Sequence, residues 1–303
     1  MCSLRKFIIR SSTDRKYFSI SIIIPLYNKA NCIKRTIQSV LTQSYKDFEL
    51  IIVDDGSTDN SKEIVLSIND TRINYIYKQN GGVSSARNFG AMKASSKWLF
   101  FLDADDILLP NALSSLTSNC SDSTPIISGG FTIKNENSEI QKIPRIEGRV
   151  KKPLRQWWLK NIMPRTGNLL LTKEIFFSLG GFDERISYNE DYGFLLKMLS
   201  TYEIFIIKQL TMVYTDDNKF LSIKHTPIES EFGNYMCNLS LENIYRRFFI
   251  YQQYTFTYKR RLMLGDKKEA YRIKHESDSR FTLLMKFTAW IMKKYSSLYE
   301  KVK

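Results

Sequence analysis

The chain has 303 residues, of which 43% are apolar, so it can bury the core of one large domain or of one domain with an appendage. Lys and Arg outnumber Asp and Glu by 45 to 31, which gives a net charge of +14. No apolar stretch approaches the roughly 20 residues that span a bilayer, and residues 1–20 lack the apolar core of a signal peptide. The four cysteines show no Cys-x-x-Cys spacing, which excludes a zinc knuckle and a disulfide framework and favours a reducing, cytoplasmic environment.

In chain order, short apolar runs alternate with segments of helical spacing. The apolar runs predict strands over 20–28, 48–58, 73–82 and 98–106, and the intervening segments predict helices over 31–44, 59–68 and 83–95. This alternation is typical of an α/β fold with a mostly parallel sheet flanked by helices. Ligands of such sheets bind beyond the carboxyl ends of the strands. The residues at these ends are therefore expected to line one crevice: Tyr27, Asp54, Asp55, Gly81, Gly82, Asp103 and Asp105.

The fourth predicted strand ends in a cluster of carboxylates, Asp103, Asp105 and Asp106. Like charges this close repel one another and resist burial, so a positive group is expected beside them. A divalent cation that arrives with an anionic ligand would serve, because Mg²⁺ and Mn²⁺ prefer carboxylate and phosphate oxygens. The alternative interpretation is a solvated acidic turn at the end of a strand.

The run from Ser21 to Pro110 resembles the nucleotide-sugar-binding half of the family 2 glycosyltransferases, and GGFDERISYNEDYGFLLKM (180–198) resembles a second signature of that family. The resemblance covers residues 18–200 and implies the GT-A fold. Together with the uneven distribution of charge, it divides the chain into a basic extension (1–17), a nucleotide-sugar-binding half (18–120), an acceptor-binding and catalytic half (121–220) and a basic, aromatic, helical C-terminal region (221–303), of which the resemblance does not cover the last hundred residues.

For the Asp-x-Asp motif, the resemblance implies that Asp105 binds Mn²⁺ or Mg²⁺ and that Asp103 lies near the ribose of the donor, with Ala104 between them. Asp106 is expected to cap the next turn. His225 is a further candidate for contact with the metal or a phosphate, although a single histidine is more often structural.

For the base of the nucleotide, the resemblance implies that Asp55 accepts a ring N–H and that the ring of Tyr27 stacks on the base. Asp54 is an open case, because a strand-end turn explains it equally well. The remaining expected donor contacts are Arg87, as a guanidinium donor to the nucleotide, Gly82, which with Gly81 allows close backbone approach, and Pro25.

The catalytic base is expected in the second signature. An inverting transfer needs a carboxylate that takes the proton of the acceptor hydroxyl. The resemblance assigns this role to Asp191, with Glu190 supporting it, although two carboxylates also suit the N-terminus of any helix. Many relatives carry Trp where this chain has Tyr192. No Gln-x-x-Arg-Trp motif of the processive synthases follows, which favours an enzyme that adds a single sugar.

Two other function classes are compatible with parts of the sequence. The motif LDADDI resembles that of phosphatases with an Asp nucleophile, but it lies past residue 100 and lacks their following residues. A basic chain with interleaved aromatic residues could bind nucleic acid, yet no nucleic-acid module is present and none is expected as a partner. We expect a transferase that moves a sugar from a UDP-sugar to a glycan or a polyprenyl-linked oligosaccharide in surface polysaccharide synthesis.

The C-terminal region carries most of the surplus charge, with 15 Lys and Arg against 5 Asp and Glu in residues 244–303. From Arg280 to Lys303 apolar residues recur at roughly helical spacing among lysines. A basic amphipathic helix of this kind suits an anionic membrane surface, here the cytoplasmic face of the inner membrane. The alternative is that the helix packs its apolar face on the catalytic domain.

Overall fold

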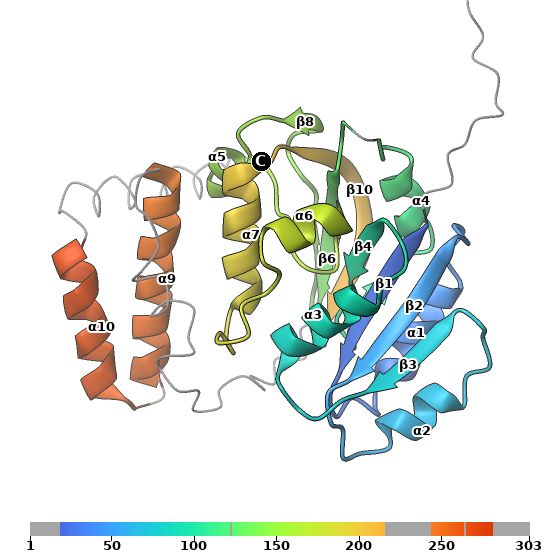
Figure 1. The fold of residues 1–303 in the computed structure, drawn as a ribbon. Helices are drawn as coiled ribbons and strands as arrows, with labels where there is room; N and C mark the ends of the chain where they lie inside the picture. The colour runs from blue at the N-terminus through green and yellow to red at the C-terminus, as the bar shows by residue number, and fades with distance from the viewer. Residues whose placement is uncertain (1–18, 122, 216–243, 264, 281–303) are drawn as a thin grey trace, which may run out of the picture.

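The computed structural model describes residues 19–121, 123–215, 244–263 and 265–280 (Figure 1). The strands are β1 (Ile20–Leu26), β2 (Phe48–Asp54), β3 (Ile73–Tyr77), β4 (Trp98–Phe101), β5 (Ile107–Leu108), β6 (Ile126–Lys134), β7 (Glu139–Lys142), β8 (Gly148–Val150), β9 (Leu169–Thr172) and β10 (Ile204–Thr215). The helices are α1 (Ile33–Leu41), α2 (Ser61–Leu66), α3 (Val83–Lys93), α4 (Ala112–Thr117), α5 (Pro153–Trp158), α6 (Lys173–Ser178), α7 (Glu190–Thr201), α9 (Ile244–Met263) and α10 (Lys267–Arg280).

The strands form one mixed sheet in the order β3-β2-β1-β4-β9-β6-β10-β5. The pairs β3-β2, β2-β1 and β1-β4 are parallel, as the alternating sequence predicted. Beyond β4 the sheet turns mixed, because β9 lies antiparallel between β4 and β6. The predicted order of strands and helices over residues 20–101 is confirmed. Each strand ends before the carboxyl end of the segment that was predicted for it.

Alternate residues of the strands face opposite sides of the sheet, and each side has its own core. Ile23, Ile51, Val53 and Phe101 pack with α3, α5, α6, α7 and α9. Ile22, Ile24, Leu50 and Phe100 pack with α1, α2 and α4. The result is a sheet covered by helices on both faces, which is why β1, β2 and β4 consist mostly of apolar residues.

The helices α9 and α10 lie side by side, with α9 on the side facing α5 and α7 and α10 on the outer side (Figure 1). Consecutive tryptophans of α5 join α9 to the rest of the protein: the ring of Trp157 stacks on Phe249 with centroids 4.2 Å apart, and that of Trp158 on Phe248 at 5.0 Å. No helix in these ranges is long and apolar enough to cross a membrane. The segment 281–303, which carries most of the predicted amphipathic helix, lies outside the described residues.

Gly90 lets α3 pack closely on β1 and β2. A Cβ atom at this position would lie 2.5 Å from Ile23 Cγ2 and 3.2 Å from Val53 Cγ2, and both partners belong to the buried core. The absence of a side chain thus sets the distance between the helix and the sheet.

We predict that Gly90→Ala destabilises the protein, although alanine is the better helix former by about 1 kcal/mol. Overpacking a tight core costs about 1–3 kcal/mol, so the net loss should reach about 2 kcal/mol in urea unfolding. Met92→Ala, at an exposed position of the same helix, is the control and should shift the free energy of unfolding by less than about 0.5 kcal/mol. A Gly90→Ala variant at least as stable as the wild type would contradict this packing.

Candidate functional site

The site lies at the edge of the sheet where the parallel strands β1, β2 and β4 end. Because the strands run in one direction, the loops that follow them come together there. Asp55 N donates to Leu26 O at 2.8 Å and Leu102 N to Ile23 O at 3.0 Å, which ties each neighbouring loop to β1. The N-terminus of α7, with Glu190 and Asp191, is joined to this edge by Arg87 of α3, which donates to Glu190 and to Asp103 in the loop after β4.

Asp54 is built into the loop after β2. Its side chain is 1% exposed, and its two oxygens accept hydrogen bonds from Ser57 N at 2.8 Å and from the Tyr75 hydroxyl at 2.6 Å. Burial and this carboxylate raise the pKa of Tyr75, so the phenol remains a donor. The contacts support the turn interpretation of Asp54, and a contact with the donor stays a prediction.

Asp55 receives three hydrogen bonds from its own protein. Lys78 Nζ donates to Oδ1 at 2.6 Å, Gly81 N to the same oxygen at 3.0 Å, and Gly82 N to Oδ2 at 2.8 Å. Gly82 has φ of 89°, a left-handed value that favours glycine, so the glycine pair brings the backbone close to this carboxylate. A carboxylate has about four acceptor positions, so the geometry still leaves room for a ring N–H of a base.

Three further residues that were expected to contact the donor, Tyr27, Pro25 and Ala104, differ in how accessible they are. Tyr27 directly follows the strand and is 46% exposed, as a ring that stacks on a ligand must be. Pro25 is a buried residue of the strand itself, and Ala104 is 4% exposed, with its carbonyl accepting a hydrogen bond from Thr36 Oγ1 at 2.8 Å. Pro25 and Ala104 therefore shape the site through the backbone.

Arg87 joins the two signatures of the sequence. It lies on α3, is 3% exposed, and donates through Nη2 to Asp103 Oδ1 at 2.6 Å and through Nη1 to Glu190 Oε1 at 2.8 Å. Burial opposes the charge, but Asp103 and Glu190 outweigh it and keep the pKa of Arg87 raised. For Asp103, burial is likewise outweighed, chiefly by Arg87, and its pKa is lowered. A direct contact of Arg87 with a nucleotide, as expected from the sequence, stays a prediction.

Asp105 forms an ion pair with Lys29, a residue of the loop after β1. The distance from Nζ to Oδ2 is 2.5 Å, and both side chains are 29% exposed. Burial lowers the pKa of Lys29, but Asp105 outweighs this and raises it. The positive charge that the acidic cluster required is thus supplied in part by Lys29 and Arg87. Sequence analysis overlooked Lys29, although a cation at the end of β1 was a usable signal.

The prediction that Asp106 caps the next turn is wrong. This carboxyl group is fully buried, and its Oδ1 accepts a hydrogen bond from Thr215 N at the end of β10, at 3.2 Å. The next helix, α4, begins with Asn111 as its N-cap residue instead. Burial, and then the neighbouring Asp103, raise the pKa of Asp106 well above its usual range, which favours the protonated acid.

Asp191 lies in the first turn of α7 with Tyr192 N donating to its Oδ1 at 2.9 Å. Burial and the charge of Glu190 raise its pKa to about 6, while Arg87 and Arg165 act in the opposite direction. A carboxylate with a pKa near neutrality is suited to accept a proton in a reaction. His225, the other predicted site residue beyond this helix, lies outside the described residues.

Helix α9 holds the segment that leads into α7. The ring of Tyr188 stacks on Phe256 with centroids 6.2 Å apart, and the Arg260 guanidinium lies 4.0 Å from the centre of the Tyr188 ring. Asn189 Nδ2 donates to Gln253 Oε1 at 3.4 Å. The three α9 residues are spaced on one face of the helix. Sequence analysis described the region of α9 as basic and aromatic, but it did not predict that α9 contacts the residues before Glu190 and Asp191.

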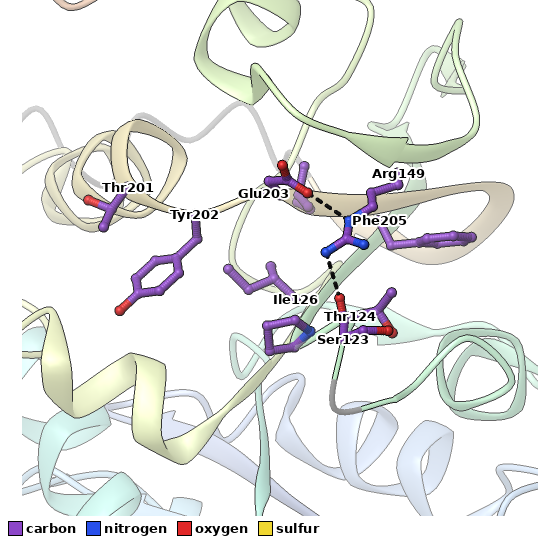
Figure 2. A pocket seen from close by; sticks show the side chains of 10 residues that line it. Ser123, Thr124, Ile126, Arg149, Thr201, Tyr202, Glu203 and Phe205 are labelled. Carbon is purple, nitrogen blue, oxygen red and sulfur yellow. Dashed lines mark hydrogen bonds and ion pairs between the residues drawn. The ribbon is translucent and has the colours of Figure 1, made fainter.

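The cavity in Figure 2 lies elsewhere. It has a volume of about 370 Å³ and is lined by the end of α7 and by the first residues of β6 and β10. Arg149 crosses it, with Nε donating to Glu203 Oε2 at 2.6 Å and Nη2 to Ser123 O at 3.1 Å. Along α7, Thr201 at the cavity lies about 15 Å from Asp191, so the cavity does not belong to the carboxylate site.

Among the described residues no cluster of three or more His, Cys, Asp or Glu side chains could hold a metal ion. Mg²⁺, however, commonly binds through one or two carboxylates together with phosphates and water. Asp105 has the required oxygen chemistry and partial exposure. The residues present therefore fit a cation that binds together with a diphosphate.

Comparison with known proteins identifies the family to which the chain is similar. The model of glycosyl transferase family 2 matches residues 21–182. An uncharacterized glycosyltransferase of Rickettsia typhi is 31% identical over 192 residues, which are 61% of this chain and 60% of the relative. The Escherichia coli protein WfgD, a UDP-Glc:alpha-D-GlcNAc-diphosphoundecaprenol beta-1,3-glucosyltransferase, is 35% identical over 127 residues, 41% of this chain and 50% of WfgD. The chain thus spans about 60% of the length of its Rickettsia relative.

The fold also matches solved structures. Staphylococcus aureus TarS in complex with UDP aligns with a TM-score of 0.64 and 18% identity, over 94% of this chain and 92% of that one. At this identity the likeness concerns the fold, and it confirms the GT-A fold expected from the sequence. Since the family model covers more than half of the 303 residues, the chain belongs to glycosyl transferase family 2.

Proposed function

We propose that this protein is an inverting glycosyltransferase that moves a sugar from a UDP-sugar to a hydroxyl group of a glycan or a polyprenyl-linked oligosaccharide. The observation that carries the proposal is the bridge through Arg87, which brings Asp103 of the Asp-x-Asp motif and Glu190, the neighbour of Asp191, to one guanidinium. The printed name of WfgD, with its UDP-sugar and diphosphoundecaprenol, and the UDP complex of TarS support the choice of substrates.

In the proposed mechanism, the exposed Tyr27 ring and Asp55 hold the base of the nucleotide. Asp191 accepts the proton of the acceptor hydroxyl as that oxygen attacks the anomeric carbon from the side opposite the diphosphate. Glu190 is fixed by Arg87 and keeps Asp191 in place through the first turn of α7. Loss of negative charge from Asp191 on protonation also lessens its repulsion from Glu190.

Asp105 would hold Mn²⁺ or Mg²⁺ when the donor is bound, and Asp103, paired with Arg87, would lie near the ribose. Such an ion would supply positive charge to the diphosphate as the glycosidic bond breaks. Lys29, which is partly exposed and paired with Asp105, would add positive charge at the same place. Contact of the C-terminal segment with the inner membrane belongs to the proposal as well, and it would place the enzyme beside a lipid-linked acceptor.

The first test of this mechanism is Asp191→Asn. The amide keeps the shape of the carboxylate but cannot take the proton, so transfer should fall roughly 10²–10⁴-fold while nucleotide binding persists. Mass spectrometry with a panel of nucleotide sugars gives turnover, and calorimetry gives binding. Asp278→Asn, at an exposed position of α10, is the matched control. Loss of nucleotide binding with Asp191→Asn would refute the role of a base.

A second test is the pH dependence of the wild-type reaction. Because the pKa of Asp191 is raised to about 6, the base is protonated and inactive below that pH and becomes active as the pH rises through it. Initial rates should therefore rise as the pH is raised through about 6 and level off near neutrality. A rate that stays constant through this range would exclude Asp191 as the titrating base.

The third test addresses the metal. Asp105→Ala should lower donor turnover by at least about 100-fold, since the charge that stabilises the leaving diphosphate is lost. The melting temperature should change little, because Asp105 is partly exposed. Excess chelator should reduce the wild type to a similar level, and added Mn²⁺ should restore it. Full wild-type activity in chelator would show that the reaction needs no divalent cation.

A further inference from the structure

Arg165 carries a charge that the proposed mechanism does not use. Its guanidinium lies 3.8 Å from the centre of the Tyr214 ring and 5.0 Å from that of Phe131. Nε is buried without a hydrogen-bond partner, and in the part of the chain that the structure describes the side chain forms no ion pair. A charged group held this way has its terminal nitrogens available for a ligand.

The loop that presents Arg165 is held rigidly. Asn168 is fully buried and accepts hydrogen bonds from Arg165 N at 2.9 Å and from Ser128 Oγ at 3.1 Å. Its amide donates to Gly129 O at 2.9 Å and to Met163 O at 3.1 Å. Next to it, Gly167 has φ of 92°, and a Cβ there would lie 2.6 Å from Met212 Sδ. Such a satisfied buried network fixes the backbone from which Arg165 projects.

The loop of Arg165 lies against the Asp-x-Asp motif. A Cβ atom at Gly167 would lie 3.6 Å from Asp106 Oδ2, and Asp106 Oδ1 accepts a hydrogen bond from Thr215 N, the residue after Tyr214, whose ring the Arg165 guanidinium faces. The charge of Arg165 also opposes the rise in the pKa of Asp191. The cations that do contact site carboxylates are already engaged: Lys78 with Asp55, Arg87 with Asp103, and Lys29 with Asp105. Arg165 therefore lies beside the Asp-x-Asp motif, and among the described residues its guanidinium forms no ion pair with a site carboxylate.

We propose that Arg165 binds a phosphate group of a substrate. A planar guanidinium matches two phosphate oxygens, and aromatic rings against its faces hold the plane in place without competing for its N–H groups. Two sources share this chemistry: the diphosphate of the donor and a phosphate of a lipid-linked acceptor. The inference rests on the proposed function, since it assigns a contact to the same site.

The experiment compares the wild type with Arg165→Gln, Arg165→Lys and the control Arg155→Gln, which removes an exposed arginine of α5. Calorimetry measures the affinities of each protein for UDP and for uridine. Separate titrations measure the affinity for inorganic phosphate, once without UDP and once with saturating UDP. Melting curves show whether each variant is folded. If Arg165→Gln is unfolded, Arg165→Lys, which keeps the charge but loses the planar fork, gives the answer.

If the phosphate belongs to the donor, Arg165→Gln weakens UDP binding about 10-fold to 100-fold and leaves uridine binding unchanged. If it belongs to the acceptor, UDP binding is unchanged, and phosphate binding in the presence of UDP is lost in Arg165→Gln but kept in Arg155→Gln. A folded variant that binds UDP and phosphate like the wild type would overturn the proposal. If the wild type binds phosphate but not UDP, and Arg165→Gln loses the phosphate binding, the phosphate contact of Arg165 is supported and the proposed UDP-sugar donor is refuted.

Discussion

The buried guanidinium of Arg87 is the interaction on which the rest of the site depends. A charge that is 3% exposed must be paired within the protein, and its partners come from the loop after β4 and from α7, 16 and 103 residues away in sequence. Removing one partner of a buried ion pair typically costs about 3–5 kcal/mol. The requirement therefore draws the end of β4, helix α3 and the start of α7 to one point. The two signatures become a single site because one side chain has to satisfy both.

The carboxylates of this site are chemically different because their surroundings differ. Arg87 keeps Asp103 ionised, burial with Glu190 raises the pKa of Asp191 to about 6, and deep burial favours the acid form of Asp106. A carboxyl group with a lowered pKa, one with a pKa of about 6 and one whose pKa is raised well above its usual range thus lie at one sheet edge. Separation of carboxyl pKa values by environment is a general way to divide ligand and acid–base roles within one site.

Sequence analysis succeeded where the signal was local. Apolar runs and helical spacing gave the order of elements over residues 20–101, and parallel pairing then placed Tyr27, Asp55 and Asp103 at one edge. It did not give the insertion of β9 between β4 and β6, the ion pair of Lys29 with Asp105, or the buried bond from Thr215 to Asp106. Each of these joins residues that are far apart in sequence, and their types alone do not identify the partner.

The contact of α9 with Tyr188 and Asn189 affects the order in which parts of the chain can fold during synthesis. Domains generally fold from the N-terminus while synthesis proceeds, and the sheet edge with Asp55, Asp103 and Asp105 is complete in sequence long before Gln253, Phe256 and Arg260 are added. A nascent chain can thus form its donor-side loops while the segment before Asp191 still lacks its support. The order of translation separates formation of the loops after β1, β2 and β4 from completion of the segment before α7, and a chain that stops before α9 would lack the contacts with Tyr188 and Asn189.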